Sequence, residues 1–384
     1  MQFNFATANS IHFGAGTAKT ISSILPANAG PIFLVTGASP YRHKAVIDLL
    51  ERNGYEIDLY SVGSEPAIET VNSGTRKARQ LGTGLVVAIG GGSVIDTGKA
   101  IAALVPNHGD AIEYLEGVGK GKPLSEQPLP FMAMPTTAGT GAEVTRNSVI
   151  GVPEAQVKVS LRSTSMLPNW AIVDPELTYD LPARVAAYTG MDALVQCLEA
   201  YLAKQANPLT DGIAREGIRL AARSIRAASS NTLNREAKSD LCLASLFGGI
   251  ALSNAKLGSV HGFAGPLGGM IDAPHGAICA SLLVSCFQMN LEILERKHPN
   301  HASLEKMRDI AVLLTGNPEA KPNYALAWFE TLHADLPLES LGKLGLTADR
   351  ISEAASKAAT ASSMKGNPIE LTQFELEEIL ENAL

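Results

Sequence analysis

A single pattern repeats along residues 1–181: a short apolar run rich in β-branched residues, a polar exit, and then a stretch with helical spacing. The apolar runs lie at 31–37, 56–63, 85–93, 130–141 and 170–178, and a helical stretch follows each of the first three. Strands that alternate with helices in this way form a parallel sheet covered on both faces. The pattern therefore predicts an α/β domain with a parallel sheet over residues 1–181.

The character of the sequence changes beyond residue 181. The segments 183–203, 210–229 and 236–252 carry apolar residues at helical spacing, and no convincing strand lies among them. The tail, at 351–363 and 371–384, has the same spacing. We therefore predict a second, all-α domain over residues 182–384, with the segment DLPARV as the hinge.

Charge and composition exclude several classes of partner. The 384-residue chain carries a formal net charge of −7, which argues against nucleic acid or an anionic membrane. The first residues lack the basic start and apolar core of a signal peptide, and the longest apolar run, at 241–253, is too short for a membrane span. The four cysteines lie in apolar contexts without a CxxC pair, as expected of reduced, buried thiols. We expect a cytoplasmic protein.

A glycine-rich turn closes the apolar run at 85–93. Glycines at 90–92 followed by Ser93 let backbone N–H groups approach a diphosphate, and a helix N-terminus favours its negative charge. Ser93 and Asp96 also fit the spacing of a capping box, so the alternative is a helix start with no ligand. That alternative does not explain three consecutive glycines, which are costly in conformational entropy. The turn predicts a dinucleotide site, although it matches neither GxGxxG nor a P-loop.

A second turn of this kind, MPTTAGTGAEVTRNS, follows the apolar run that begins at residue 130. The hydroxyl and amide groups of Thr136, Thr137 and Thr140 suit contacts with ribose and phosphate, and the alternative is an ordinary loop after a strand. Two such turns from one sheet support cofactor binding more strongly than either turn alone.

Two histidines lie in the apolar, glycine-rich stretch SVHGFAGPLGGMIDAPHG. Such surroundings predict that His261 and His275 are buried or half-buried, where an unpaired ring nitrogen costs about 1–3 kcal/mol. A metal ion would satisfy both rings, and Asp192 is the best candidate for a third ligand. The alternative is a pair of hydrogen-bonded core histidines.

The motifs together resemble those of the iron-containing, or group III, alcohol dehydrogenases. The resemblance covers essentially the whole chain in the right order, through FGAG, GGGSVIDTGKA, PTTAGTGAEVTRNSVI, AIVDPELTYDLPARVAAYTGMDAL, EAY, SNAKLGSVHG, PLGG and PHGAICASLL. It implies an N-terminal dinucleotide-binding domain, a helical C-terminal domain and a divalent metal. It also implies interconversion of alcohols with aldehydes or ketones by means of a nicotinamide cofactor, in a protein that commonly forms dimers.

The implied metal site departs from the family pattern. The family uses an aspartate, a histidine four residues later and two further histidines; here Asp192, His261 and His275 match, but residue 196 is Gln. Gly265 also stands where the family typically has a histidine near the substrate. An amide oxygen is a weaker ligand than imidazole, so the site has either three protein ligands completed by water or Gln196, or no metal at all. Zinc becomes favoured over iron.

The implied cofactor site departs from the family as well. Where the family often has an aspartate that contacts the adenosine ribose, this chain has Gly37, with Arg42 and Lys44 close behind. Loss of a carboxylate beside added cations favours NADP over NAD, unless the cations are just the start of a surface helix. The expected cofactor contacts are made by Gly37, Gly91, Gly92, Ser93, Asp96, Thr136, Thr137, Thr140 and Lys158.

These observations predict an NAD(P)-dependent oxidoreductase that reduces a small aldehyde or ketone, with oxo acids among the candidates. His275 and Lys158 are the expected catalytic residues, and a metal-assisted reaction is the favoured form. The alternatives are a metal-independent reductase similar to maleylacetate reductases, a lyase resembling dehydroquinate synthase, and a binding protein that kept the fold without the activity.

Overall fold

The computed structural model describes residues 2–26, 29–63, 65–155, 157–230 and 232–384. Two compact units make up the chain. The α/β unit consists of Thr7–Thr137 and Gly141–Asp180. The helical unit consists of Leu181–Leu384 together with Ala138–Thr140 and the chain up to Ala6.

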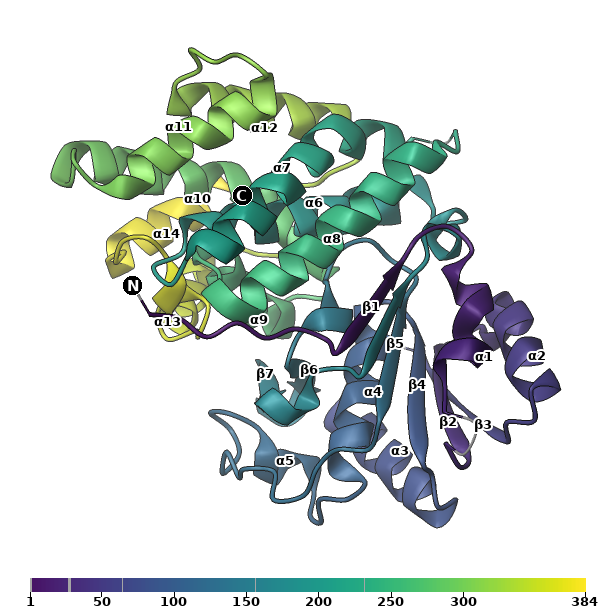
Figure 1. Ribbon diagram of the computed structural model, residues 1–384. Helices are drawn as coiled ribbons and strands as arrows, with labels where there is room; N and C mark the ends of the chain where they lie inside the picture. The colour runs from purple at the N-terminus through teal and green to yellow at the C-terminus, as the bar shows by residue number, and fades with distance from the viewer. Residues whose placement is uncertain (1, 27–28, 64, 156, 231) are drawn as a thin grey trace. The chain divides into compact units, whose positions relative to one another are not determined.

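The α/β unit alternates strands and helices, as Figure 1 shows. Its strands are β1 (Ser10–Phe13), β2 (Ile32–Gly37), β3 (Ile57–Val62), β4 (Leu85–Gly90), β5 (Phe131–Pro135), β6 (Asn147–Val152), β7 (Val157–Arg162) and β8 (Trp170–Val173). Its helices are α1 (Ile21–Ile24), α2 (Lys44–Arg52), α3 (Ile68–Gln80), α4 (Gly92–Leu104) and α5 (Ala111–Tyr114).

Six strands form one parallel sheet in the order β1-β8-β5-β4-β2-β3. From β2 the chain adds β3 on one side and then β4, β5 and β8 on the other, so the order reverses between β2 and β4. The predicted parallel α/β fold is thereby confirmed. The reversal matters because ligands of open parallel sheets bind beyond the carboxyl ends of the strands at such a point.

Both faces of the sheet are buried, because successive side chains of a strand point to opposite faces. Ile32 and Leu34 of β2 pack with residues of α1 and α2 on one face. Phe33 and Val35 pack with residues of α3 and α4 on the other. This two-sided burial explains why the strands are continuous apolar runs rather than alternating ones.

Three predicted strands end several residues earlier in the structure than in the sequence pattern. β4, β5 and β8 end at Gly90, Pro135 and Val173, and the polar exits that follow them belong to turns or helix starts. The capping-box interpretation of Ser93 is wrong, because α4 begins at Gly92 with Gly91 at its N-cap and has no side-chain cap among the described residues. The edge strand β1 and the antiparallel hairpin β6–β7 were not predicted.

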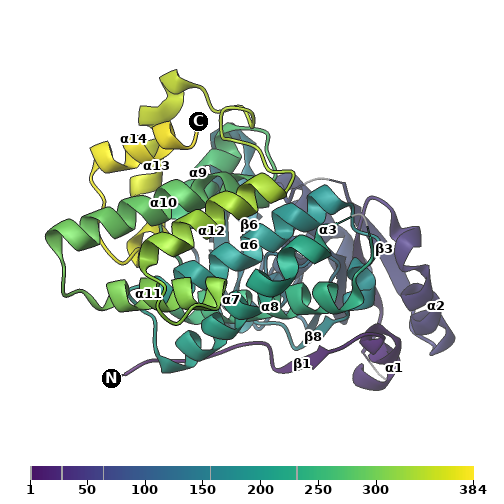
Figure 2. The same cartoon turned by 90° about the horizontal axis from the view of Figure 1, so that it is seen from above.

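The helical unit contains α6 (Ala183–Leu202), α7 (Pro208–Ala228), α8 (Arg235–Ala255), α9 (Ser259–Met270), α10 (His275–Lys297), α11 (Ala302–Thr315), α12 (Pro322–Asp335), α13 (Ile351–Ala359) and α14 (Gln373–Asn382). Figure 2 shows α10 and α12 running alongside each other within this unit. Helix α6 packs against α7, α8 and α10 and is buried over most of its length. The predicted all-helical second half is therefore confirmed.

Close helix contacts in this unit depend on glycine. A Cβ on Gly276 would lie 2.2 Å from the backbone oxygen of Tyr188, so the first turn of α10 can rest directly on the backbone of α6. A Cβ on Gly217 would lie 2.4 Å from the sulfur of Cys197, which explains the close approach of α7 to α6. These contacts bring side chains of α6 and α10 within reach of one another.

Helix α10 is long and apolar enough to cross a membrane by length and composition alone. The bent pair of α8 and α9 passes the same test with a 99° break. In α10, 72% of the most apolar window is buried inside the protein, as in the core helix of a globular domain. Its apolarity is therefore explained by packing.

Candidate functional site

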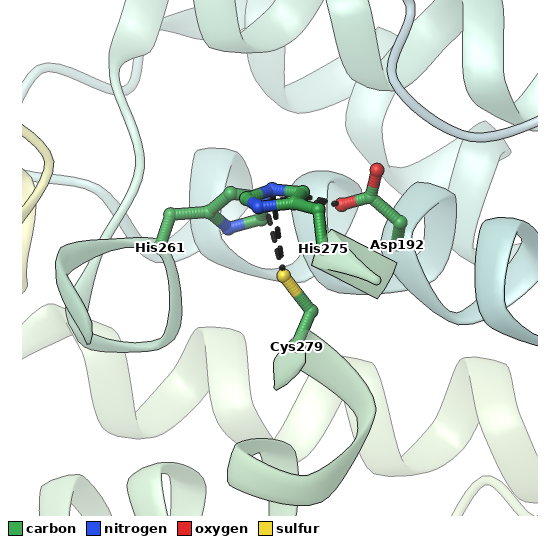
Figure 3. A group of neighbouring side chains, drawn as sticks. All are labelled: Asp192, His261, His275 and Cys279. Atoms are coloured by element: carbon green, nitrogen blue, oxygen red, sulfur yellow. Dashed lines mark hydrogen bonds and ion pairs between the residues drawn. The ribbon is translucent and has the colours of Figure 1, made fainter. Parts of the chain in front are cut away.

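Four side chains with metal-binding atoms converge in the helical unit, as Figure 3 shows. They are Asp192 from α6, His261 from α9, and His275 and Cys279 from α10. One ligand atom from each lies within 4.8 Å of the other three. The structure thus brings together three of the four predicted metal ligands and adds a thiol.

The individual distances show how tight this cluster is. Asp192 Oδ1 lies 3.2 Å from His261 Nε2 and 3.8 Å from His275 Nε2. Cys279 Sγ lies 3.9 Å from His261 Nε2 and 3.7 Å from His275 Nε2. The two Nε2 atoms therefore face the same carboxylate oxygen and the same sulfur.

Secondary structure places each of these groups. His275 is the first residue of α10, and Cys279 follows one turn later on the same helix face. His261 lies in the first turn of α9, and Asp192 lies in the buried middle of α6. The sequence-based expectation that the two histidines are buried or half-buried is confirmed, since His261 is buried and His275 is partly exposed.

Glu199 orients His261 and was not predicted from the sequence. The Nδ1–H of His261 donates to Glu199 Oε2 at 2.8 Å, which leaves Nε2 directed at the cluster. The backbone N–H groups of Val260 and His261 also donate to this carboxylate, at 2.6 and 3.2 Å. A carboxylate bound to the far nitrogen of a ligating histidine fixes its tautomer and ring orientation. The signal was available, because residues 192 and 199 lie two turns apart on one face of a helix.

The start of α9 is held by a second polar contact. The N–H of Ser259 donates to Asn367 Oδ1 at 3.1 Å, and Asn367 in turn donates to Asn290 Oδ1 at 2.7 Å. Gly258 makes room for this arrangement, since a Cβ there would lie 2.9 Å from Glu199 Oε1. The free N–H groups of the first turn thus find acceptors, and the Glu199 carboxylate complements the helix dipole.

The cluster is electrostatically coupled. Burial raises the pKa of Asp192, but hydrogen bonding with His261 and the charge of His275 outweigh it and hold the pKa below its ordinary value. Burial likewise disfavours the thiolate of Cys279, yet the charges of His275 and His261 lower the pKa of this thiol. Burial lowers the pKa of His275, and the opposing charge and hydrogen bond of Cys279 raise it to about 9.

The same balance acts on His261. Burial lowers its pKa, and interactions with Cys279, Asp192 and Glu199 raise the pKa well above 6.5. The buried site therefore favours positive charge among its anionic groups. A divalent cation supplies such charge, and the carboxylate, imidazole and thiol donors are all ligands that zinc accepts.

Gln196 is buried one turn after Asp192, and its side chain forms a hydrogen bond that lowers the pKa of the Asp192 carboxyl. Its Oε1 has no hydrogen-bond partner among the described residues. This oxygen lies on the side of α8, where a Cβ on Gly248 would be 3.1 Å away. Gln196 thus contacts the cluster through Asp192. Gly265 leaves open space, since a Cβ there would meet no described atom within 4 Å.

The predicted cofactor residues of the α/β unit gather at one edge of the sheet. Gly37 ends β2, Gly90 ends β4, and the N–H of Thr136 donates to Gly90 O at 2.9 Å. β2, β4 and β5 are neighbours, so these ends lie side by side at the point where the strand order reverses.

The glycine turn after β4 fits a phosphate. Gly91 and Gly92 open α4, and a Cβ on Gly91 would lie 3.4 Å from the Thr137 side chain. With no side chain as N-cap, the N–H groups at the start of α4 are available to an anion. The two predicted turns thus lie next to each other.

Other predicted cofactor residues have protein partners. Asp96 Oδ2 accepts from the Val149 N–H at 2.9 Å and so ties α4 to β6. Lys158 on β7 forms an ion pair with Glu65 at 2.7 Å. Thr140 belongs by its contacts to the helical unit rather than to the α/β unit. The roles predicted for these three residues stay predictions.

Comparison with known proteins identifies the family. Residues 8–175 match the model for iron-containing alcohol dehydrogenase, and residues 186–384 match the C-terminal domain of the Fe-containing alcohol dehydrogenase family. Alcohol dehydrogenase 4 of Saccharomyces cerevisiae (strain YJM789) is 32% identical over 337 residues, which cover 87% of this chain and 85% of the relative.

Solved structures agree with this result. A crystal structure of 1,3-propanediol oxidoreductase matches with a TM-score of 0.92 and 32% identity, covering 100% of both chains. Sulfoacetaldehyde reductase from Bifidobacterium kashiwanohense in complex with NAD⁺ matches with a TM-score of 0.87 and 28% identity, covering 100% of this chain and 99% of that one.

The chain therefore belongs to the iron-containing alcohol dehydrogenase family. It is an enzyme, an alcohol dehydrogenase, and its chemistry is the nicotinamide-dependent oxidoreduction of that family.

Proposed function

We propose that the protein reduces a small aldehyde or ketone to the corresponding alcohol in a metal-assisted reaction with NADPH as the favoured cofactor. The observation that carries the proposal is the convergence of Asp192, His261 and His275 within the helical unit of a chain of this family. Oxo acids are included among the candidate substrates.

Each part of the proposed site has a role. Asp192, His261 and His275 would hold a divalent metal, which when bound supplies a Lewis acid for the carbonyl oxygen while the nicotinamide supplies hydride. Glu199 holds a proton of His261 on Nδ1, so that Nε2, which faces Asp192, is the nitrogen that would ligate the metal. Burial of Asp192 and His261 excludes water and strengthens every charge interaction there.

The α/β unit would bind the dinucleotide. The N–H groups at Gly91, Gly92 and Ser93 would hold the diphosphate, with Thr136 and Thr137 on the adjoining turn. Asp96 is proposed to shape this turn, Lys158 to anchor cofactor or substrate, and Thr140 to add a hydroxyl contact. His275 and Lys158 remain the proposed catalytic residues.

The preference for NADP rests on the end of β2. A side chain on Gly37 would meet no described atom within 4 Å, which leaves space where an aspartate would repel a 2′-phosphate. Arg42 is exposed nearby in sequence, whereas Lys44 forms an ion pair with Asp48 at 2.5 Å. Arg42 is thus the better candidate for contact with the phosphate.

Two further expectations belong to this proposal. The four cysteines are free and buried, which suits the reducing cytoplasm. The family resemblance supports a homodimer, for which light scattering should give twice the chain mass of 40.3 kDa.

The test is turnover of NADPH and NADH with a panel of small aldehydes, ketones and oxo acids, before and after chelation. We expect reduction that is lost on chelation and restored by Zn²⁺ or Fe²⁺. Turnover that persists without metal would instead favour the metal-independent reductase. Bound cofactor with no net turnover would favour the lyase or the binding protein.

A further inference from the structure

We propose that Cys279 is the fourth protein ligand of the metal, so that the centre is formed by Asp192, His261, His275 and a thiolate and selects zinc over iron. This inference rests on the proposed metal-assisted function and concerns the composition of that same site. In the family pattern a histidine four residues after the aspartate is the fourth ligand. Residue 196 is Gln here, and the inference assigns that fourth coordination position to Cys279.

The distances between donor atoms fit a single tetrahedral ion. Bond lengths of about 2.0–2.1 Å to nitrogen and oxygen and about 2.3 Å to sulfur place tetrahedral donors roughly 3.3–3.6 Å apart. Four of the six separations between these donor atoms run from 3.2 Å, between Asp192 Oδ1 and His261 Nε2, to 3.9 Å, between Cys279 Sγ and His261 Nε2. These four separations lie within a few tenths of an ångström of the tetrahedral values, and the other two are no longer than 4.8 Å.

The sulfur is placed by the same helix that places His275. The spacing of four residues puts both side chains on one face of α10, and the sulfur lies 3.7 Å from His275 Nε2. Figure 3 shows Cys279 below the two imidazole rings in this view, with its sulfur pointing toward them. Removal of the sulfur would leave this position without a protein donor.

Gln196 is the competing candidate, and its contacts disfavour it. Its amide oxygen lies against Gly248 of α8, while its hydrogen bond goes to the Asp192 carboxylate. In this arrangement Gln196 presents a donor group, not a lone pair, to the site. We therefore assign it the role of a positioning residue for Asp192.

The donor set has a consequence for metal choice. Thiolate is a soft ligand that favours zinc, whereas a centre of carboxylate and imidazole alone accepts iron readily. Replacing one imidazole with one thiolate keeps the number of protein ligands at four. The expected change is thus in selectivity and not in the existence of the site.

The experiment begins with the full-length protein, stripped by chelation and reloaded with one equivalent of Zn²⁺ or Co²⁺. X-ray absorption at the zinc edge should show one sulfur and three nitrogen or oxygen scatterers. The cobalt form should show a thiolate-to-metal charge-transfer band in the near ultraviolet. Both signals come from the wild-type protein and need no variant to fold.

Variants then assign the sulfur. Cys279→Ser should abolish both sulfur signals and weaken zinc binding by at least about 100-fold, the upper end of what loss of an outer-shell partner costs. Cys286→Ser is the matched control, because this buried cysteine lies two turns further along α10 and outside the cluster. It should keep both signals.

A rescue variant completes the test. In Gln196→His combined with Cys279→Ser, an imidazole one turn from Asp192 replaces the thiolate, so zinc binding should recover without a sulfur signal. Iron should then compete better with zinc than in the wild type.

The possible outcomes separate this inference from the proposed function. Bound metal with no sulfur scatterer, a sulfur signal that survives Cys279→Ser, or one that is lost in Cys286→Ser would each overturn the assignment while the metal-assisted reaction stands. Failure of the wild type to bind any metal would overturn both the ligand assignment and metal assistance. Carbonyl turnover would then show whether the protein is a metal-independent reductase.

Discussion

Glu199 is the single residue on which the orientation of His261 depends most directly. Its carboxylate accepts hydrogen bonds from the Nδ1–H of His261 and from two backbone N–H groups at the start of α9. An acceptor at Nδ1 holds a proton on that nitrogen, so that Nε2, which faces Asp192, is the nitrogen whose proton a metal would replace; only an unprotonated nitrogen ligates a metal.

Glu199→Gln should therefore weaken metal binding by about 10–100-fold. The amide can accept only through its oxygen, so its NH₂ group would oppose either the Nδ1–H of His261 or the backbone N–H of Val260, and either arrangement disturbs the placement of the ring. A competition titration against a chromogenic chelator measures the change. Glu330→Gln, at an exposed position of α12, serves as the control. Equal affinity in wild type and Glu199→Gln would mean that Glu199 only holds the backbone of α9.

Glu143 gives a prediction about stability and pH. Burial raises its pKa to about 7, despite the opposing charge of Lys99. The unfolded chain ionises near 4.5, so the folded state binds the extra proton between these values, and stability from this group falls as pH rises through 7.

Glu143→Gln removes the buried charge and should stabilise the protein at pH 7.5 by up to about 3 kcal/mol, with little gain at pH 4.5. Thermal unfolding at both pH values measures this difference. Both values lie below the lowered pKa of Lys99, about 8, so most of this lysine is charged at each pH in the wild type. A gain of equal size at both values would show that the effect is not one of ionisation.

Gly37 gives a prediction about cofactor choice. Gly37→Asp should lower the ratio of kcat/KM for NADPH to that for NADH by at least about tenfold, because a carboxylate there repels a 2′-phosphate and accepts from a ribose hydroxyl. Steady-state kinetics with both cofactors measure the ratio, and Gly212→Asp, at an exposed position of α7 where a Cβ would meet no described atom within 4 Å, controls for added charge. An unchanged ratio would place the 2′ position elsewhere.

At the scale of elements, the sequence predicted those strands and helices whose own residues carry the signal. The strands β2, β4, β5 and β8 are apolar, the edge strand β3 is more mixed in composition, and all five are followed by glycine or polar turns, so their existence was predictable even where their ends were not. β1 has four residues, all only half-buried, and its partner β8 is distant in sequence. The local pattern of apolar residues gives no information about a pairing between strands so far apart in the sequence.

The same distinction applies to the elements of the site. Helix α9 contains Pro266 and several glycines, which locally indicate a loop, yet packing against α10 and α13 makes it helical. His261 and His275 could be predicted from their apolar surroundings and Asp192 from the helix it shares with Gln196. The apolar context of Cys279 predicts only a buried thiol, although its spacing of four residues from His275 places the two side chains on one helix face.

The contact between α10 and α6 yields a prediction at this scale. Gly276→Ala would place a methyl group 2.2 Å from the Tyr188 backbone oxygen and force the first turn of α10 away from α6. We expect destabilisation of about 1–3 kcal/mol and weaker metal binding, because His275 and Asp192 separate. Gly212→Ala, in open space on α7, should instead stabilise by about 0.5–1 kcal/mol. Thermal melts with and without zinc test both.

At the scale of the whole molecule, the residues proposed to bind the metal and those proposed to bind the dinucleotide belong to different units. Asp192, His261, His275 and Cys279 all belong to the helical unit. Gly37, Gly91 and Ser93 belong to the α/β unit. Because a ligand stabilises the structure that contains its site by RT ln(1 + [L]/Kd), each ligand should protect its own unit first.

Hydrogen exchange followed by mass spectrometry tests this division. Zinc at 100 times its Kd should raise the free energy of the openings that expose amides of α6, α9 and α10 by up to about 2.7 kcal/mol, and so slow their exchange. Exchange in β3 and α3 should be unchanged. NADP⁺ should slow exchange around the ends of β2 and β4 instead. Magnesium at the same concentration, which prefers oxygen ligands, should protect neither region. Zinc protection centred on the α/β unit would mean that the ion binds away from the Asp192 cluster, and with it the proposed metal centre would fail.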